Sequence, residues 1–118
     1  MRPAPGMDHL LERGISLFNH GEFFACHEVL EEAWTPERGP RRLFLQSLIH
    51  MAVGFYHHSR GNPAGASRQL RKGLRKLAGY LPVHEAIDTA RLEREAREAL
   101  ARIESGQPIP VYPLIHLG

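Results

Sequence analysis

Apolar residues recur at helical spacing along most of the chain, and Gly and Pro interrupt the pattern at intervals. This pattern predicts five helices, at about residues 7–19, 22–34, 41–60, 63–81 and 89–104. Asp8, Asn19 and Asp88 are suited to cap the first, second and fifth helices, and Pro63 is suited to the first turn of the fourth. The segment 83–87 between the last two helices is short and is expected to be extended.

The links between successive helices predict how the helices pair. Gly21 leaves almost no loop between the first two helices, and Gly61-Asn62 leaves almost none between the next two. We therefore expect antiparallel hairpins at 7–34 and 41–81, followed by a fifth helix at 88–104. The expected fold class is all-α, a compact bundle of about five helices faintly like a tetratricopeptide pair, in one domain over residues 1–118. Residues 1–6 are expected to form a mobile tail, and the Pro-rich tail 105–118 is expected to lie along the bundle surface or in a dimer contact.

The second helix carries the most distinctive polar residues. At about 100° per residue, its apolar side chains fall on one arc, and His27 and Glu31 lie just past the edge of that arc at i,i+4 spacing. Trp34 and Phe23 lie beside them, so a half-buried pair is expected. One interpretation is a hydrogen-bonded pair that orders the core edge, and the other is a ligand-binding or acid–base pair.

The third helix is apolar nearly all round and should therefore be central and buried. Its residues that are not large and apolar form a narrow stripe at i, i+4, i+8 and i+11, which comprises Gln46, His50, Gly54 and His57. Ser47 lies at the edge of this stripe. A polar stripe on such a helix must face polar partners, and the expected counterpart is the pair His27 and Glu31. Gly54 would let a neighbouring helix or a small ligand approach closely.

Charge is distributed unevenly along the chain. Residues 1–37 hold seven acidic and two basic residues, residues 38–84 hold nine basic and no acidic ones, and residues 85–118 hold six acidic and four basic ones. The net charge is only +2. We therefore favour the interpretation that the basic middle of the chain, residues 38–84, docks on the acidic N-terminal segment, residues 1–37. The fourth helix has a basic face that comprises Arg68, Arg71, Lys72, Arg75 and Lys76. This face is either a solvated surface or an anion-binding patch.

Composition narrows the protein class. A chain of 118 residues with 42% hydrophobic and 24% charged residues is typical of one globular domain. Cys26 is the only cysteine, which excludes an intrachain disulfide and suits a reducing compartment. The first residues contain no apolar signal-peptide region, and no apolar stretch is long enough to span a bilayer. We therefore expect a cytoplasmic protein without membrane contacts.

Two segments resemble the signature of domain-of-unknown-function family 309. The first is FNHGEFFACHEVLEEAW, which contains an H-E-x-x-E motif, and the second is FLQSLIHMAVGFYHHSRGNPAGA. The resemblance covers about Leu10 to Leu81 and implies a small, all-helical, bacterial or archaeal cytoplasmic domain without implying an activity. The polar positions that match the family are His27, Glu28, Glu31, Gln46 and Asn62.

Three functions remain open, and whether the chain is an enzyme is not decided by its sequence. The first is a binding module, with a protein, a small molecule or a second copy as partner, whose polar site comprises His27, Glu28, Glu31, Trp34, Gln46, His50, His57 and Asn62. The second is an enzyme that uses a divalent transition metal, Zn or Fe, held by His27 and Glu31 together with His50, or alternatively His57, from the facing helix. The third and least favoured is nucleic-acid binding through Arg68, Arg71, Lys72 and Arg75, because no aromatic interleaving or nucleic-acid motif accompanies them.

Overall fold

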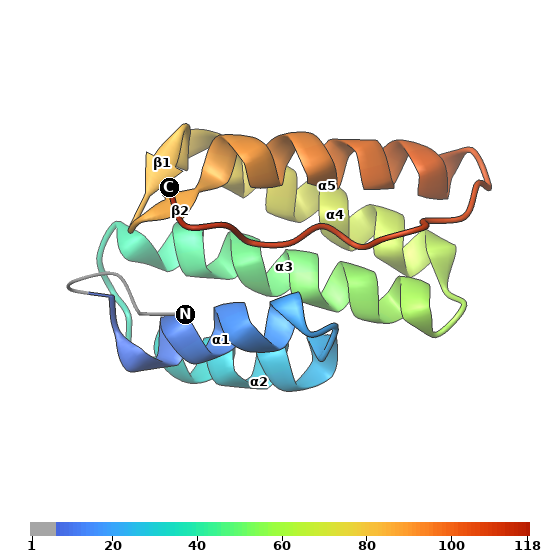
Figure 1. Ribbon diagram of the computed structural model, residues 1–118. Coiled ribbons are helices and arrows are strands. Elements are labelled where there is room, and N and C mark those ends of the chain that lie inside the picture. The colour runs from blue at the N-terminus through green and yellow to red at the C-terminus, as the bar shows by residue number, and fades with distance from the viewer. Residues whose placement is uncertain (1–6) are drawn as a thin grey trace.

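A computed structural model describes residues 7–118, so the tail predicted at 1–6 lies outside the described residues. The elements are α1 (His9–Asn19), α2 (Phe23–Trp34), α3 (Arg41–Ser59), α4 (Pro63–Leu77), a 3₁₀ turn (Ala78–Tyr80), β1 (Val83–His84), β2 (Ile87–Asp88) and α5 (Thr89–Glu104). The hairpins α1–α2 and α3–α4 pack together through α2 and α3, and α5 covers α4 (Figure 1). The predicted all-α fold class is confirmed. Among the described residues, no helix is long and apolar enough to cross a membrane.

The first residues of α1 and α5 follow from the predicted capping residues. The Asp8 carboxylate accepts a hydrogen bond from the Leu11 amide at 2.8 Å, and the Asp88 carboxylate accepts one from the Arg91 amide at 3.0 Å. Gly21 and Gly61 sit at the two hairpin turns with φ of 74° and 76°. Only glycine adopts this left-handed backbone without strain, which explains its place at both turns.

The prediction that Asn19 caps the second helix is wrong. Asn19 is the last residue of α1, and Glu22 precedes α2 without any side-chain capping bond. The Asn19 amide instead holds the C-terminal tail, because its Nδ2 donates to the Ile115 carbonyl at 2.9 Å and its Oδ1 accepts from the Ile115 amide at 2.7 Å. The side chain therefore joins residues that are 96 positions apart.

The region after α4 differs from the predicted helix to residue 81. α4 ends at Leu77, and the predicted extended segment forms the antiparallel pair β1–β2, in which Val83 faces Asp88 and His84 faces Ile87. Ile87 also forms an isolated bridge with Leu117 of the tail. The tail thus lies along the bundle, as expected, but it also inserts Ile115 into the core.

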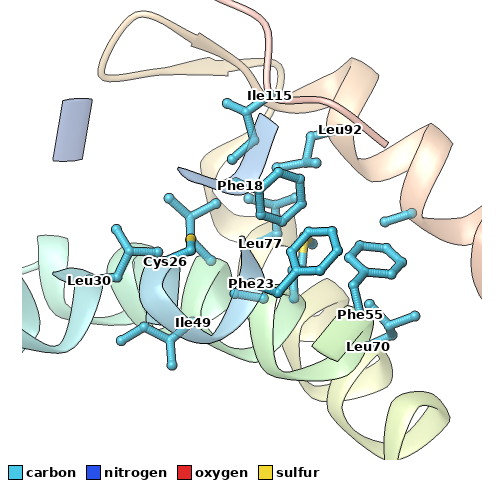
Figure 2. Close-up of a cluster of buried hydrophobic side chains, with 14 of the residues drawn as sticks. Phe18, Phe23, Cys26, Leu30, Ile49, Phe55, Leu70, Leu77, Leu92 and Ile115 are labelled. Carbon is cyan, nitrogen blue, oxygen red and sulfur yellow. The ribbon is translucent and has the colours of Figure 1, made fainter. Parts of the chain in front are cut away.

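Aromatic side chains from α1, α2, α3 and the tail meet in the core. The rings of Phe18, Phe23 and Phe55 lie 5.3–6.0 Å apart, and the Tyr112 ring lies 5.1 Å from Phe23 and 5.4 Å from Phe55. Figure 2 shows these phenylalanines beside buried Leu70 and Ile115. Because the cluster draws on elements from both ends of the chain, it fixes α2 against α3 and so fixes the surface they share.

Close packing of α3 against α4 depends on glycine. A Cβ atom at Gly54 would lie 3.0 Å from Leu70 Cγ and 3.3 Å from the Ala66 carbonyl oxygen, as the sequence predicted for a closely approaching helix. A Cβ atom at Gly73 on α4 would lie 3.0 Å from the Ser47 carbonyl oxygen of α3. The two helices therefore approach more closely than larger residues would allow.

Candidate functional site

One pocket brings together side chains from α2, α3 and α4. It has a volume of about 280 Å³, and we call it the α2–α3–α4 groove. Its walls are formed by His27, Glu31, Trp34, Gln46, Ile49, His50, Val53 and Gln69. Five of the residues predicted for a polar site lie in this set, so α2 and the polar stripe of α3 do face a common space.

On the α2 wall, His27 has a defined orientation. Its Nδ1 donates to the Phe24 carbonyl at 2.8 Å, and its Nε2 lies 3.5 Å from a Glu31 carboxylate oxygen. Because a carbonyl oxygen can only accept, Nδ1 carries a proton, and Nε2 is the ring nitrogen that faces Glu31. The side chains are 21% and 52% exposed, so His27 is mostly buried and Glu31 lies at the rim.

On the opposite wall, His50 lies between two side chains of α4. Its Nδ1 lies 2.8 Å from Gln69 Oε1, and its Nε2 lies 2.8 Å from Lys76 Nζ. An amide oxygen can only accept and an ammonium can only donate, so His50 donates through Nδ1 and accepts through Nε2. With Lys76 as an ammonium, this arrangement requires neutral His50.

The surroundings of His50 favour its neutral form. Burial lowers the pKa of His50, the Gln69 hydrogen bond opposes that shift, and the cations Lys76, Lys72 and Arg75 lower the pKa further. Burial, followed by repulsion from Lys72 and Arg75, also lowers the pKa of Lys76. Positive charge therefore accumulates on the α4 wall, while Glu31 and His27 face it from α2.

These pKa shifts predict a pH dependence of stability. Because the pKa of His50 is below its ordinary value of 6.5, the unfolded chain binds this proton more readily than the folded one. The free energy of unfolding should therefore fall as the pH drops below about 6.5 and level off below the folded-state pKa. Urea titrations of wild type and His50→Gln between neutral and mildly acidic pH should give a flatter dependence for the variant. Parallel curves for the two proteins would contradict this assignment.

The Trp34 indole forms the end of the α2 wall. Its Nε1–H is buried and has no hydrogen-bond acceptor among residues 7–118. The Arg42 guanidinium lies 3.9 Å from the ring centroid and donates to the Trp34 carbonyl at 3.1 Å, which fixes the ring from the other side. A buried donor without a partner is costly, so an acceptor that reaches it would be stabilised.

Three predicted site residues lie outside the groove. Glu28 is exposed on the outer face of α2. At the α3–α4 turn, His57 Nδ1 lies 3.3 Å from Asn62 Nδ2, and the Asn62 side chain caps α4 by accepting from the Gly65 amide at 3.0 Å. His57 and Asn62 therefore stabilise the turn, and the α3 stripe faces the groove only through Gln46 and His50.

The basic middle of the chain meets acidic residues at two places. Arg41 pairs with Asp8 and, at 3.7 Å, with Glu37 of the N-terminal segment, as predicted, and at 2.8 Å with Glu85, which lies outside that segment. On α4, Arg71 pairs with the Glu104 carboxylate of α5 through bonds of 2.7 and 2.8 Å.

The other cations of α4 do not pair with acidic residues of the chain as expected. Within residues 7–118, no ion-pair partner is present for Arg68, Lys72, Arg75 or Lys76. The α4 surface is therefore positively charged beside the groove. Gln69 and Lys76, which the sequence-based site had not included, lie seven residues apart and so share one face of α4.

The groove offers His27 Nε2 and a Glu31 oxygen to a metal ion, but His50 presents neither nitrogen freely. Both of its ring nitrogens are hydrogen-bonded, one of them by an ammonium group that would repel a cation. Over residues 7–118, no group of three or more His, Cys, Asp or Glu side chains is arranged to hold a metal. Cys26 is buried, its Sγ donates to the Gly14 carbonyl at 3.2 Å, and burial raises its pKa to about 12, so it is not a reactive thiolate.

The chain belongs to the family described as "Domain of unknown function (DUF309)", which matches residues 11–69. It is similar to "Uncharacterized protein YpuF" of Bacillus subtilis (strain 168), with 33% identity over 94 residues, covering 79% of this chain and 50% of that protein. It is also similar to an "Uncharacterized protein" of Aquifex aeolicus (strain VF5), with 25% identity over 100 residues, covering 84% of this chain and 30% of that protein. The chain thus spans half or less of the length of these curated relatives. All eight groove-lining residues lie within the part that matches the family.

Proposed function

We propose that this chain is a binding module and that the α2–α3–α4 groove binds a small polar ligand. The observation that carries the proposal is the convergence of polar side chains from three helices beside an apolar surface. His27, Gln46 and Gln69 supply hydrogen-bonding groups, while Ile49 and Val53 supply the apolar surface. An apolar pocket with a few convergent polar groups is the usual form of a small-molecule site.

The size of the groove limits the ligand. Its volume of about 280 Å³ is close to the lower end of small-molecule pockets, which measure about 300–1,000 Å³. A metabolite-sized molecule fits this space, whereas a folded partner would contact only the rim. The ligand is therefore a small molecule or one terminal group of a larger one.

The polar groups need little reorganisation to bind. The His27 ring is held by the Phe24 carbonyl, and the His50 ring is held by Gln69 and Lys76. Ordering side chains at a binding site reduces affinity, so groups that are already fixed favour binding.

The proposal predicts ligand-induced changes at three reporters in the groove. We would titrate ¹⁵N-labelled protein with inorganic phosphate, acetate, acetamide and ethylammonium, one at a time. At least one probe should shift the Trp34 indole N–H signal and the Gln46 and Gln69 side-chain amide signals saturably. Val53→Trp fills the groove and should abolish these shifts, whereas Val83→Trp, at a 53% exposed position on β1, should retain them. Shifts that persist in Val53→Trp, or their absence with every probe, would contradict the proposal.

A metal-dependent role is the second candidate, and one observation favours it. A metal-binding histidine commonly donates its other ring N–H to a carbonyl, as His27 does to Phe24. Elemental analysis of wild type and His27→Ala distinguishes the candidates. A stoichiometric transition metal that is lost in the variant would favour the metal-dependent role.

A further inference from the structure

We infer that the ligand of the α2–α3–α4 groove carries an oxyanion, a phosphate or a carboxylate, which binds at the α4 wall to Lys76, with Lys72 beside it. This inference rests on the proposed function and adds the chemical class of the ligand. Four properties of the described residues support it: free donors, uncompensated charge, a neutral histidine that holds the lysine, and a carboxylate at the far rim.

The groove-lining residues and Lys76, which contacts His50 of the groove wall, carry donors that have no acceptor. Lys76 carries three N–H donors, and its one hydrogen bond within residues 7–118 goes to His50 Nε2. Gln69 uses its Oε1 to accept from His50, which leaves its amide hydrogens without a partner among the same residues. The Nε1–H of the groove-lining Trp34 is buried and also has no partner there. Unpaired donors on and beside the groove wall favour a ligand that supplies acceptor oxygens.

The positive charge on this wall lacks a counterion. Lys72, Arg75 and Lys76 have no ion-pair partner among residues 7–118, whereas Arg71 on the far side of α4 pairs with Glu104. Lys72 and Lys76 lie one turn apart and lean toward the Gln69 side of the helix. An oxyanion at this wall would replace cation–cation repulsion with attraction and would accept charge-assisted hydrogen bonds.

His50 holds Lys76 in position. Burial first, and then the cations around it, lower the pKa of His50, so that at neutral pH the ring accepts a hydrogen bond from Lys76 without competing for an anion. Gln69 fixes the ring from the other side at 2.8 Å. A lysine oriented in this way loses less conformational freedom on binding than a lysine in free solution.

Glu31 at the opposite rim limits how far negative charge can extend. Its carboxylate is 52% exposed, and the exposed outer face of α2 adds Glu28 and Glu32. A polyanion such as a nucleic-acid strand would meet these carboxylates when it crossed the groove, whereas a small oxyanion at the α4 wall would not. We therefore favour a small ligand over nucleic acid, and we expect Glu31→Gln to tighten anion binding.

The test compares two variants that each remove one positive charge from α4. Lys76→Met removes the cation at the groove, and Arg68→Met removes an exposed, unpaired cation on the outer face of the same helix. The dissociation constants of inorganic phosphate and acetate are measured at fixed ionic strength from the Trp34 indole signal. Lys76→Met should weaken binding about tenfold or more, the effect of losing a charge-assisted hydrogen bond. Arg68→Met should change it by about twofold or less.

The probes also separate the sources of the oxyanion. Tighter binding of phosphate would assign a phosphorylated ligand, and tighter binding of acetate would assign a carboxylic acid. Equal weakening by Lys76→Met and Arg68→Met would overturn the inference, because it would show general attraction to a basic surface. Saturable binding of acetamide or ethylammonium in the groove without binding of either anion would also overturn it, yet the proposed function would stand. If no probe binds in the groove, both fail.

Discussion

Replacing Phe55 with alanine is expected to lower the free energy of unfolding by about 3–5 kcal/mol. Phe55 is fully buried on α3, and its ring contacts those of Phe18, Phe23 and Tyr112. The substitution removes a large apolar surface and leaves a cavity that helices from both hairpins cannot easily close. Urea denaturation monitored by circular dichroism measures the loss.

Phe24→Ala is the matched control for this prediction. Phe24 is 50% exposed on α2, and its ring lies 5.0 Å from that of His27 and 5.4 Å from that of Tyr56. Its replacement should cost about 1 kcal/mol or less. Comparable losses in the two variants would show that the aromatic cluster is not the centre of the fold.

Replacing Gly73 with valine is expected to destabilise the protein by about 1–3 kcal/mol, even though valine has the higher helix propensity. The new Cβ would lie 3.0 Å from the Ser47 carbonyl oxygen, 3.1 Å from Met51 Cγ and 3.2 Å from His50 Cβ. Two of these contacts involve atoms at or next to the α3 backbone, so α4 must move away from α3. Such a shift would also separate Lys76 and Gln69 from His50 and weaken binding in the groove.

The same substitution at Gly79 tests whether crowding causes the effect. Apart from its own turn and its two chain neighbours, no atom lies within 4 Å of a Cβ built at Gly79, which belongs to the 3₁₀ turn after α4. Gly79→Val should change stability by about 0.5 kcal/mol or less and should leave binding unchanged. If Gly73→Val were as stable as wild type, the close α3–α4 contact would not be a requirement of the fold.

Local sequence signals were sufficient to predict most of the fold. Asp8 and Asp88 cap the helices that they were expected to cap, and Gly21 and Gly61 mark both hairpin turns. Each of these features depends on residues within a few positions of one another. The bond between Asn19 and Ile115 was not predicted, because it joins segments 96 residues apart and no periodicity encodes that pairing.

Only the α2 and α3 residues of the candidate site could be predicted from the sequence as neighbours. The i,i+4 pair on α2 and the polar stripe on α3 identified His27, Glu31, Gln46 and His50 as neighbours, because helical geometry fixes which residues share a face. Gln69 was missed, and the sequence left open whether Lys76 lies on a solvated surface or in an anion-binding patch, without linking it to His50. Its contact with His50 follows from how closely α4 packs on α3, which depends on Gly54 and Gly73.

The most direct test of oxyanion binding in the α2–α3–α4 groove is a crystal structure of the wild-type protein soaked with inorganic phosphate. We expect phosphate in the groove, with an oxygen within hydrogen-bonding distance of Lys76 Nζ. In crystals of Lys76→Met we expect no phosphate there. A groove that stays empty while phosphate binds on the outer face of α4, at Arg68, would contradict this prediction.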